Sequence, residues 1–160
     1  MALSRTISLL LILLFIGFSS SGQVLPSNEV EYDSIYAINI KLSKINGVYI
    51  PKDLFEAHQQ LIKLTPKESL DKFKMAEEKE VCKKLHFGIG RWMIVNWNFY
   101  DGSRMSHYLK EKGVLHPDDM AQFILRTFHR NLNKLESDQE NIIKELAEAR
   151  KKEAEYLINN

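Results

Sequence analysis

The sequence lacks several features that stabilise proteins or mark their chemistry. It has a single cysteine, Cys82, so an internal disulfide cannot form and stability must come from a packed core. Metal-ligand spacings such as His-Glu-x-x-His or paired Cys-x-x-Cys are absent. The third glycine of a dinucleotide-binding motif does not follow Gly88 and Gly90. We therefore predict no cofactor, and no familiar motif indicates an enzyme.

Long apolar runs are also scarce. The run Ile7–Phe18 is shorter than the roughly 20 residues needed to cross a bilayer. Arg5 precedes it and the small residues Ser19–Gly22 follow, an order typical of a secretory signal peptide. We therefore predict that residues 1–22 are a signal peptide, cleaved near Gln23, and that the protein is exported to the periplasm or outside the cell. A retained membrane anchor is the alternative.

An excess of one charge is missing too. Arg5 is the single charged residue of the predicted signal peptide, so the rest of the chain carries 21 basic and 21 acidic side chains. A neutral protein has no overall field that would attract nucleic acid or an anionic membrane. We therefore predict neither a nucleic-acid partner nor a membrane partner after the signal is removed.

Helical periodicity dominates the remaining sequence. We predict a polar tether over residues 23–34, a mainly α-helical domain over residues 35–133 and a charged helix over residues 134–160. Within the domain, residues 35–42 alternate apolar and polar side chains, which favours a strand. Asn46-Gly47 is a turn signal that favours a small hairpin. The predicted fold is a compact, mainly α domain with a small N-terminal β-hairpin and a long C-terminal helix.

Three isolated polar residues allow a structural and a functional interpretation. His58 lies on the apolar face of its predicted helix, where a hydrogen-bonded core histidine is expected more often than a ligand. Cys82 is either a small buried apolar group or a reactive thiol beside lysines. Asn96 stands in an apolar run, and leaving its amide unpaired there would cost about 1–3 kcal/mol. We interpret all three as structural.

The segment LHPDDMAQFIL, residues 115–125, begins a predicted helix. Pro117 suits the first helical position, and Asp118 and Asp119 suit the positive end of the helix dipole by about 0.3–1 kcal/mol each. His116 then stands at or near the N-cap. This interpretation requires no function.

Two further interpretations give the carboxylates of this segment a partner. In one, Arg104 pairs with Asp118 or Asp119 and fixes the angle between two helices. In the other, His116, Asp118 and Asp119 are the metal or proton-transfer site of a metal-assisted hydrolase, which another histidine must complete. The two histidines that could do so are His86 and His107.

The same helix carries a polar stripe on the side opposite its apolar residues. The spacing predicts a single exposed basic face, which makes it a candidate surface for a protein partner. Its members are Gln122, Arg126, His129, Arg130 and Asn133.

The C-terminal helix has a thin apolar stripe. Ile143, Ala147, Ala154 and Ile158 recur at helical spacing beside Leu146. Two interpretations remain open. The stripe docks on the domain, or residues 137–158 pair with another chain and form a homo-oligomer.

Several segments together resemble a small, largely bacterial family that is catalogued only as a domain of unknown function. The resemblance runs from about Ile45 to Asn133 and implies no activity. It rests on Gly-x-Gly-x-Trp from Gly88, Asn-Trp from Asn96, Gly-Ser-Arg from Gly102 and His-Pro-Asp-Asp-Met from His116.

The chain departs from the family pattern at a few positions. Members tend to have Arg-Asn at Ile94 and Val95, serine at Ala121 and glycine at Asn98. The retained polar and aromatic positions, together with the basic stripe, are the candidate binding residues. They are Trp92, Asn96, Trp97, Arg104, His116, Asp118, Asp119, Arg126, His129 and Arg130.

The function that the sequence favours is a non-catalytic binding or interaction module with a protein partner. The alternative is the metal-assisted hydrolase described above.

Overall fold

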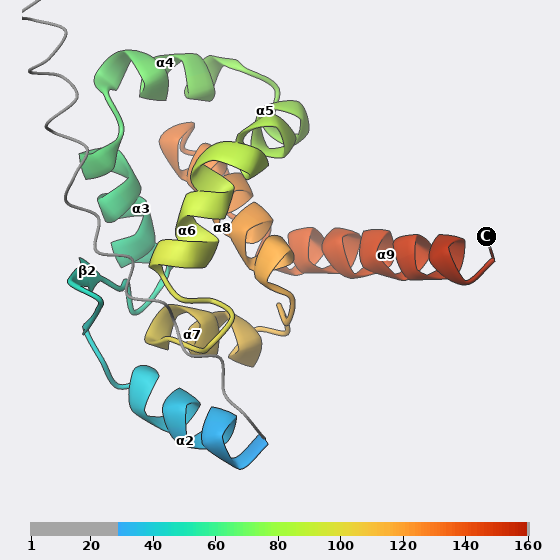
Figure 1. Ribbon diagram of the computed structural model, residues 1–160. Helices are drawn as coiled ribbons and strands as arrows, with labels where there is room; N and C mark the ends of the chain where they lie inside the picture. Colours follow the sequence, from blue (N-terminus) through green and yellow to red (C-terminus); the bar gives the residue numbers. More distant parts are fainter. Residues whose placement is uncertain (1–28, 160) are drawn as a thin grey trace, which may run out of the picture.

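The computed structural model describes residues 29–159, and helices account for most of them (Figure 1). None of the helices in this part of the chain has the length and apolar character to span a membrane. The elements are α2 (Glu29–Asn39), β1 (Lys44–Ile45), β2 (Val48–Tyr49), α3 (Leu54–Leu64), α4 (Lys67–Met75), α5 (Glu78–Leu85), the π-helix η2 (His86–Gly90), α6 (Arg91–Asn96), α7 (Arg104–Glu111), α8 (Pro117–Leu132) and α9 (Gln139–Ile158).

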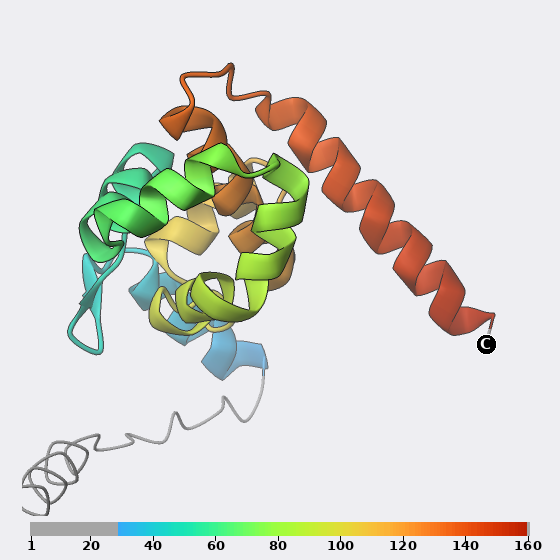
Figure 2. The ribbon, with the colours of Figure 1, turned by 90° about the horizontal axis from the view of Figure 1, so that it is seen from above.

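Helix α8 lies at the centre, and α3, α4, α5, α6, α7 and α9 all contact it. Figures 1 and 2 show it surrounded by these elements. The helix begins as the sequence predicts, with Pro117 in the first position and two carboxylates in the first turn. Its apolar side is buried and forms the middle of the hydrophobic core. The core residues of α8 include Met120, Phe123, Ile124 and Phe128.

The polar stripe of α8 is not exposed, so the prediction of a basic surface is wrong. Arg126 and His129 are only 6% and 5% exposed. Arg126 Nε lies 2.8 Å from Glu78 Oε1, and its Nη1 lies 2.8 Å from Glu145 Oε2. Arg130 Nε lies 2.8 Å from the other oxygen of Glu78. Helices α5 and α9 therefore cover the stripe and pair with its charges.

The uncharged members of the stripe bind backbone carbonyls of neighbouring segments. Gln122 donates to the carbonyl of Cys82 at 3.1 Å, and Asn133 donates to that of Lys74 at 3.1 Å. His129 Nε2 lies 3.0 Å from the carbonyl of Ala76. These bonds attach the end of α4 and the body of α5 to α8. Sequence periodicity identified one polar side of the helix, but that side faces protein instead of solvent.

The N-terminal region contains one wrong prediction and one confirmed one. Residues 35–42 do not form a strand, because helix α2 extends to Asn39 and also takes up the end of the predicted tether. The hairpin is present, with Lys44 opposite Tyr49 and Ile45 opposite Val48. Asn46 and Gly47 both have positive φ, as its tight turn requires.

Aromatic contacts hold α2 on the domain. Tyr32 and Tyr36 lie four residues apart and stack with ring centroids 6.1 Å apart. The hydroxyl of Tyr36 lies 3.0 Å from His107 Nδ1. The ring of Tyr36 packs directly on Gly102, where any Cβ would collide with it. This helical pairing of tyrosines explains why a sequence with strand-like alternation forms a helix.

A π-helix joins α5 to α6. The backbone N–H of Arg91 donates to the carbonyl of His86, five residues earlier. A Cβ at Gly90 would lie 3.3 Å from His86 Nδ1, so glycine leaves room for the wider turn. Helix α6 buries Met93 and Ile94 and ends at Asn96, and the chain then turns at Asn98 with φ 54°.

The structural interpretation of the three isolated polar residues is confirmed. His58 Nε2 lies 3.2 Å from the hydroxyl of Thr127, and burial lowers the pKa of His58 to about 4. Cys82 is fully buried, and burial raises the pKa of its thiol to about 12. Asn96 donates to the carbonyl of Trp92 at 2.9 Å.

The buried Arg126 pairs should contribute strongly to stability. We expect Arg126→Met to lower the free energy of unfolding by about 3 kcal/mol, because it removes two charge-assisted hydrogen bonds at a largely buried site and leaves Glu78 with Arg130 alone and Glu145 with the exposed Lys79. Urea denaturation at neutral pH measures this. Lys72→Met is the control, since it breaks the exposed Lys72–Glu68 pair and should cost under about 0.5 kcal/mol. Equal costs for the two variants would contradict this expectation.

The buried His58 should make stability depend on pH. Its pKa of about 4 lies below the ordinary value of 6.5. Between these values the unfolded chain takes up a proton that the folded chain does not, so stability decreases as the pH falls from about 6.5 to about 4. We expect His58→Leu to reduce the loss of unfolding free energy between pH 7 and pH 4.5 by about 2 kcal/mol. An unchanged pH dependence in urea denaturation would contradict this.

Candidate functional site

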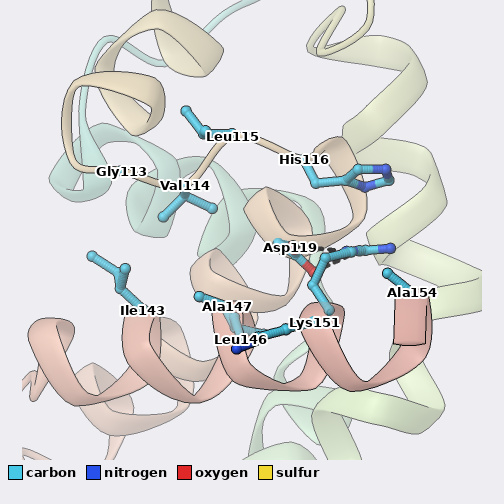
Figure 3. Close-up of a pocket in the computed structure, with 11 residues that line it drawn as sticks. Gly113, Val114, Leu115, His116, Asp119, Ile143, Leu146, Ala147, Lys151 and Ala154 are labelled. Carbon is cyan, nitrogen blue, oxygen red and sulfur yellow. Dashed lines mark hydrogen bonds and ion pairs between the residues drawn. The ribbon is translucent and has the colours of Figure 1, made fainter. Parts of the chain in front are cut away.

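A groove of about 440 Å³ lies between α9 and the segment that leads from α7 into α8. Figure 3 shows side chains of this segment and of α9 facing one another across the hollow. One wall contains the beginning of the His-Pro-Asp-Asp segment, and the other is the C-terminal helix. The lining residues are Gly113, Val114, Leu115, His116, Asp119, Ile143, Leu146, Ala147, Arg150, Lys151 and Ala154.

The first wall follows from how α7 ends. Gly113 has φ 88°, a left-handed conformation that glycine adopts without strain and that terminates the helix. Val114 then inserts into the core and is 3% exposed, whereas Leu115 is 69% exposed. His116 adopts an extended conformation as the N-cap of α8. The turn therefore anchors itself with one apolar residue and presents the next to solvent.

The second wall comes from α9, whose apolar side divides in two. Ile142 is fully buried and Leu146 is half-buried, so the first half of α9 docks on the domain. Ile143, Ala147 and Ala154 face the groove. From Lys151 to Ile158 every residue is exposed, and Figure 2 shows this end of α9 extending away from the domain. Docking on the domain is thus confirmed for the first half of the helix.

An ion pair spans one end of the groove. Arg150 Nη2 lies 2.7 Å from Asp119 Oδ1, and Arg150 Nε lies 3.2 Å from Asp119 Oδ2. This two-point geometry is typical of strong arginine–carboxylate pairs. The hydrogen bond to Asp119 raises the pKa of Arg150. The pair therefore fixes α9 against the start of α8.

The predicted pairing of Arg104 with this carboxylate is wrong. Arg104 Nε donates to the carbonyl of Ile50 at 2.7 Å, and its Nη2 lies 3.4 Å from Glu56 Oε2. Its guanidinium also lies 5.1 Å from the ring centroid of Tyr49. Arg104 therefore joins α7 to the hairpin and α3. The arginine that pairs with Asp119 is Arg150 of α9, which lies outside the region of family resemblance.

Asp118 collects the neighbouring basic groups. Its Oδ1 lies 3.1 Å from His86 Nε2 and 3.8 Å from Arg91 Nη1, and its Oδ2 lies 3.5 Å from His116 Nδ1. The π-helix brings His86 to this position. The structure thus brings together two of the histidines considered for a metal site with one of the two aspartates.

The geometry does not support the metal-assisted hydrolase. Asp119 is engaged by Arg150, and His107 lies on α7 next to Tyr36 and Glu111. Within residues 29–159, no group of three or more histidine, cysteine, aspartate or glutamate side chains could hold a metal ion. The structural interpretation of the helix start is sufficient for Pro117 and its neighbours.

The remaining candidate residues have structural partners. Trp97 is 1% exposed and makes an edge contact with Trp92, with ring centroids 5.9 Å apart. Arg126, Arg130 and His129 join helices, as described above. Sequence reasoning named the apolar groove residues of α9 as a stripe but missed Arg150 and Lys151. What it could not supply was the segment that the stripe faces.

The ion pair across the groove can be measured by a double-mutant cycle. We expect Asp119→Asn and Arg150→Met each to destabilise the protein in urea denaturation, with a coupling free energy of about 1 kcal/mol because both remove the same interaction. Asp119→Asn combined with Arg104→Met is the control pair and should be additive within about 0.5 kcal/mol. Coupling in the control pair but not in the first pair would refute the assignment of Arg150 as the partner.

Comparison with known proteins identifies the family but no activity. No curated protein and no solved structure matches the chain. A family model described as "Domain of unknown function (DUF6794)" matches residues 50–132, slightly more than half of the chain. The matched region includes the His-Pro-Asp-Asp wall of the groove and stops before α9. The chain therefore belongs to the DUF6794 family.

Proposed function

We propose that the protein is a non-catalytic binding module that holds a helix of a partner protein in the groove between α9 and residues 113–116. The observation that carries the proposal is an open hollow with a mainly apolar lining on an otherwise charge-balanced protein. Amphipathic helices bind in such grooves through apolar residues at helical spacing.

The small side chains on the α9 wall of the groove leave room for a second helix. Ala147 and Ala154 are seven residues apart on α9, so they lie on the same side and their small side chains allow a second helix to approach closely. Leu115 on the opposite wall is 69% exposed and offers apolar area. A partner helix with leucine-sized residues on one face would bury these side chains.

The charges around the groove favour an acidic partner. Arg150 is neutralised by Asp119, but Lys151 on the rim is 79% exposed and its contact with Glu155 is long, at 4.0 Å. Lys144 lies seven residues earlier on the same side of α9 and is exposed. The partner that fits is therefore an amphipathic helix with glutamate or aspartate beside its apolar face.

A second copy of the chain fits less well. Its α9 would offer the exposed Leu157 and Ile158, but the basic run at residues 150–152 interrupts the acidic residues of that helix, which Lys144 and Lys151 would favour. Homo-oligomerisation through residues 137–158 is therefore the competing outcome of the experiment. Export of the protein and removal of residues 1–22 stay predictions from the sequence, because those residues lie outside the described part of the chain.

The proposal is tested with a designed helical peptide that has leucines at positions i, i+3, i+4 and i+7 and glutamates elsewhere. We expect it to bind the full chain in fluorescence anisotropy, and to bind Ala147→Arg at least tenfold more weakly because the arginine fills the groove. Ala149→Arg is the matched control, since Ala149 is exposed on the same helix but does not line the groove. It should bind like the unmodified chain.

The other outcomes are equally informative. A peptide with lysine in place of glutamate should bind more weakly, and equal binding would overturn the choice of an acidic partner. Unchanged binding by Ala147→Arg would overturn the groove as the site. Self-association in sedimentation experiments that Ala147→Arg abolishes, without peptide binding, would assign the groove to a second copy.

A further inference from the structure

A second hollow lies beneath α4, away from the groove. Its volume is about 200 Å³, and helices α4, α5 and α8 and the π-helix supply its apolar lining. On α8 it is formed by residues two to three turns beyond the groove end of that helix. The apolar lining residues are Leu70, Phe73, Leu85, Ile89, Leu125 and Phe128.

Helix α4 enters the core through one side chain. Phe73 is the one buried residue of α4, and it stacks on Phe128 with ring centroids 5.6 Å apart. Leu70, one turn earlier, remains half-buried. Helix α4 therefore contacts α8 through Phe73, and apolar side chains of both helices line the space beside this contact.

The π-helix shapes the facing wall. Leu85 ends α5 and Ile89 lies within the π-helix, and both are half-buried and line the hollow. The wider π-turn, for which Gly90 leaves room beside His86, sets the direction in which Ile89 points. Single π-turns within helices are frequent at functional sites.

The chemistry of the lining indicates the class of ligand. An apolar cavity of about 150 Å³ stays dry and binds a ligand such as benzene, so this hollow holds about eight carbon atoms. Its remaining lining residues, Thr65 and Ser69, carry hydroxyls, and Ser69 is exposed. These hydroxyls can hydrogen-bond an uncharged polar group at the mouth. Among the described residues no charged side chain lines the pocket, so the pocket offers no ion-pair partner that would favour a charged head group.

We propose that the pocket beneath α4 binds the end of a single acyl chain with an uncharged polar head. The chain packs between Leu70, Leu85 and Leu125, and the head lies beside Ser69. This site is independent of the groove and of the proposed protein partner.

The test is a titration of the full chain with octan-1-ol, followed by methyl NMR. We expect saturable shifts concentrated on the methyl groups of Leu70, Leu85, Ile89 and Leu125. Ser69→Trp should weaken binding at least tenfold, because the indole closes the mouth of the pocket. Asp71→Trp is the matched control, since it adds the same ring to an exposed position of α4 that does not line the pocket. It should bind like the unmodified chain.

Three results would overturn the proposal. They are the absence of saturation, shifts spread over methyl groups throughout the core, or binding by Ser69→Trp equal to that of Asp71→Trp. Octanoate should bind more weakly than octan-1-ol, and tighter binding of octanoate would refute an uncharged head. Ala147→Arg should leave octan-1-ol binding unchanged, which separates this site from the groove.

Discussion

The ion pairs of Glu78 with Arg126 and Arg130 are the interaction on which the arrangement of helices depends. Both arginines lie on α8, and the single carboxylate of α5 that joins them is largely buried. Arg126 also reaches Glu145, so the same guanidinium binds α5 and α9. Removing charges from water is unfavourable unless each finds a well-placed partner. The mutual fit of these three helices is therefore constrained more tightly than apolar packing alone would require.

The groove is a consequence of this constraint. Helix α9 is attached to α8 at two points, by Glu145 to Arg126 and by Arg150 to Asp119, and the fully buried Ile142 anchors it in the core. Residues 145 and 150 lie on the domain side, so the side of α9 that carries Ala147 and Ala154 is left facing the turn before α8. The groove thus comes partly from the family domain and partly from a helix that follows it.

Sequence reasoning located the start of α8, the C-terminal helix and the hairpin because each has a local signal. Pro117 with two carboxylates, the Asn46-Gly47 turn and the glycine at 113 act within a few residues of where they stand. Asn98 has a φ of 54°, a left-handed conformation that glycine adopts more readily than other residues, so the glycine expected there from the resemblance would suit the turn. By contrast, the spacing of polar residues identified the members of the α8 stripe but did not show whether they are exposed. Whether a polar stripe meets solvent or another helix is decided by distant segments, here α5 and α9, whose charges match it.

The His-Pro-Asp-Asp segment illustrates why a group of histidines and carboxylates need not be a reaction centre. Asp118 gathers His86, Arg91 and His116, and Asp119 takes up Arg150, so both carboxylates serve the packing of elements around the start of α8. A substitution at Asp119 would disturb both the start of α8 and the position of α9. A loss of peptide binding by such a variant would therefore not distinguish between these two effects. Ala147 has no such structural role, since it is exposed and makes the groove only by its small size. Function in this protein is therefore best separated from stability at the small and exposed positions beside the motif, where added volume changes the surface and leaves the ion pairs in place.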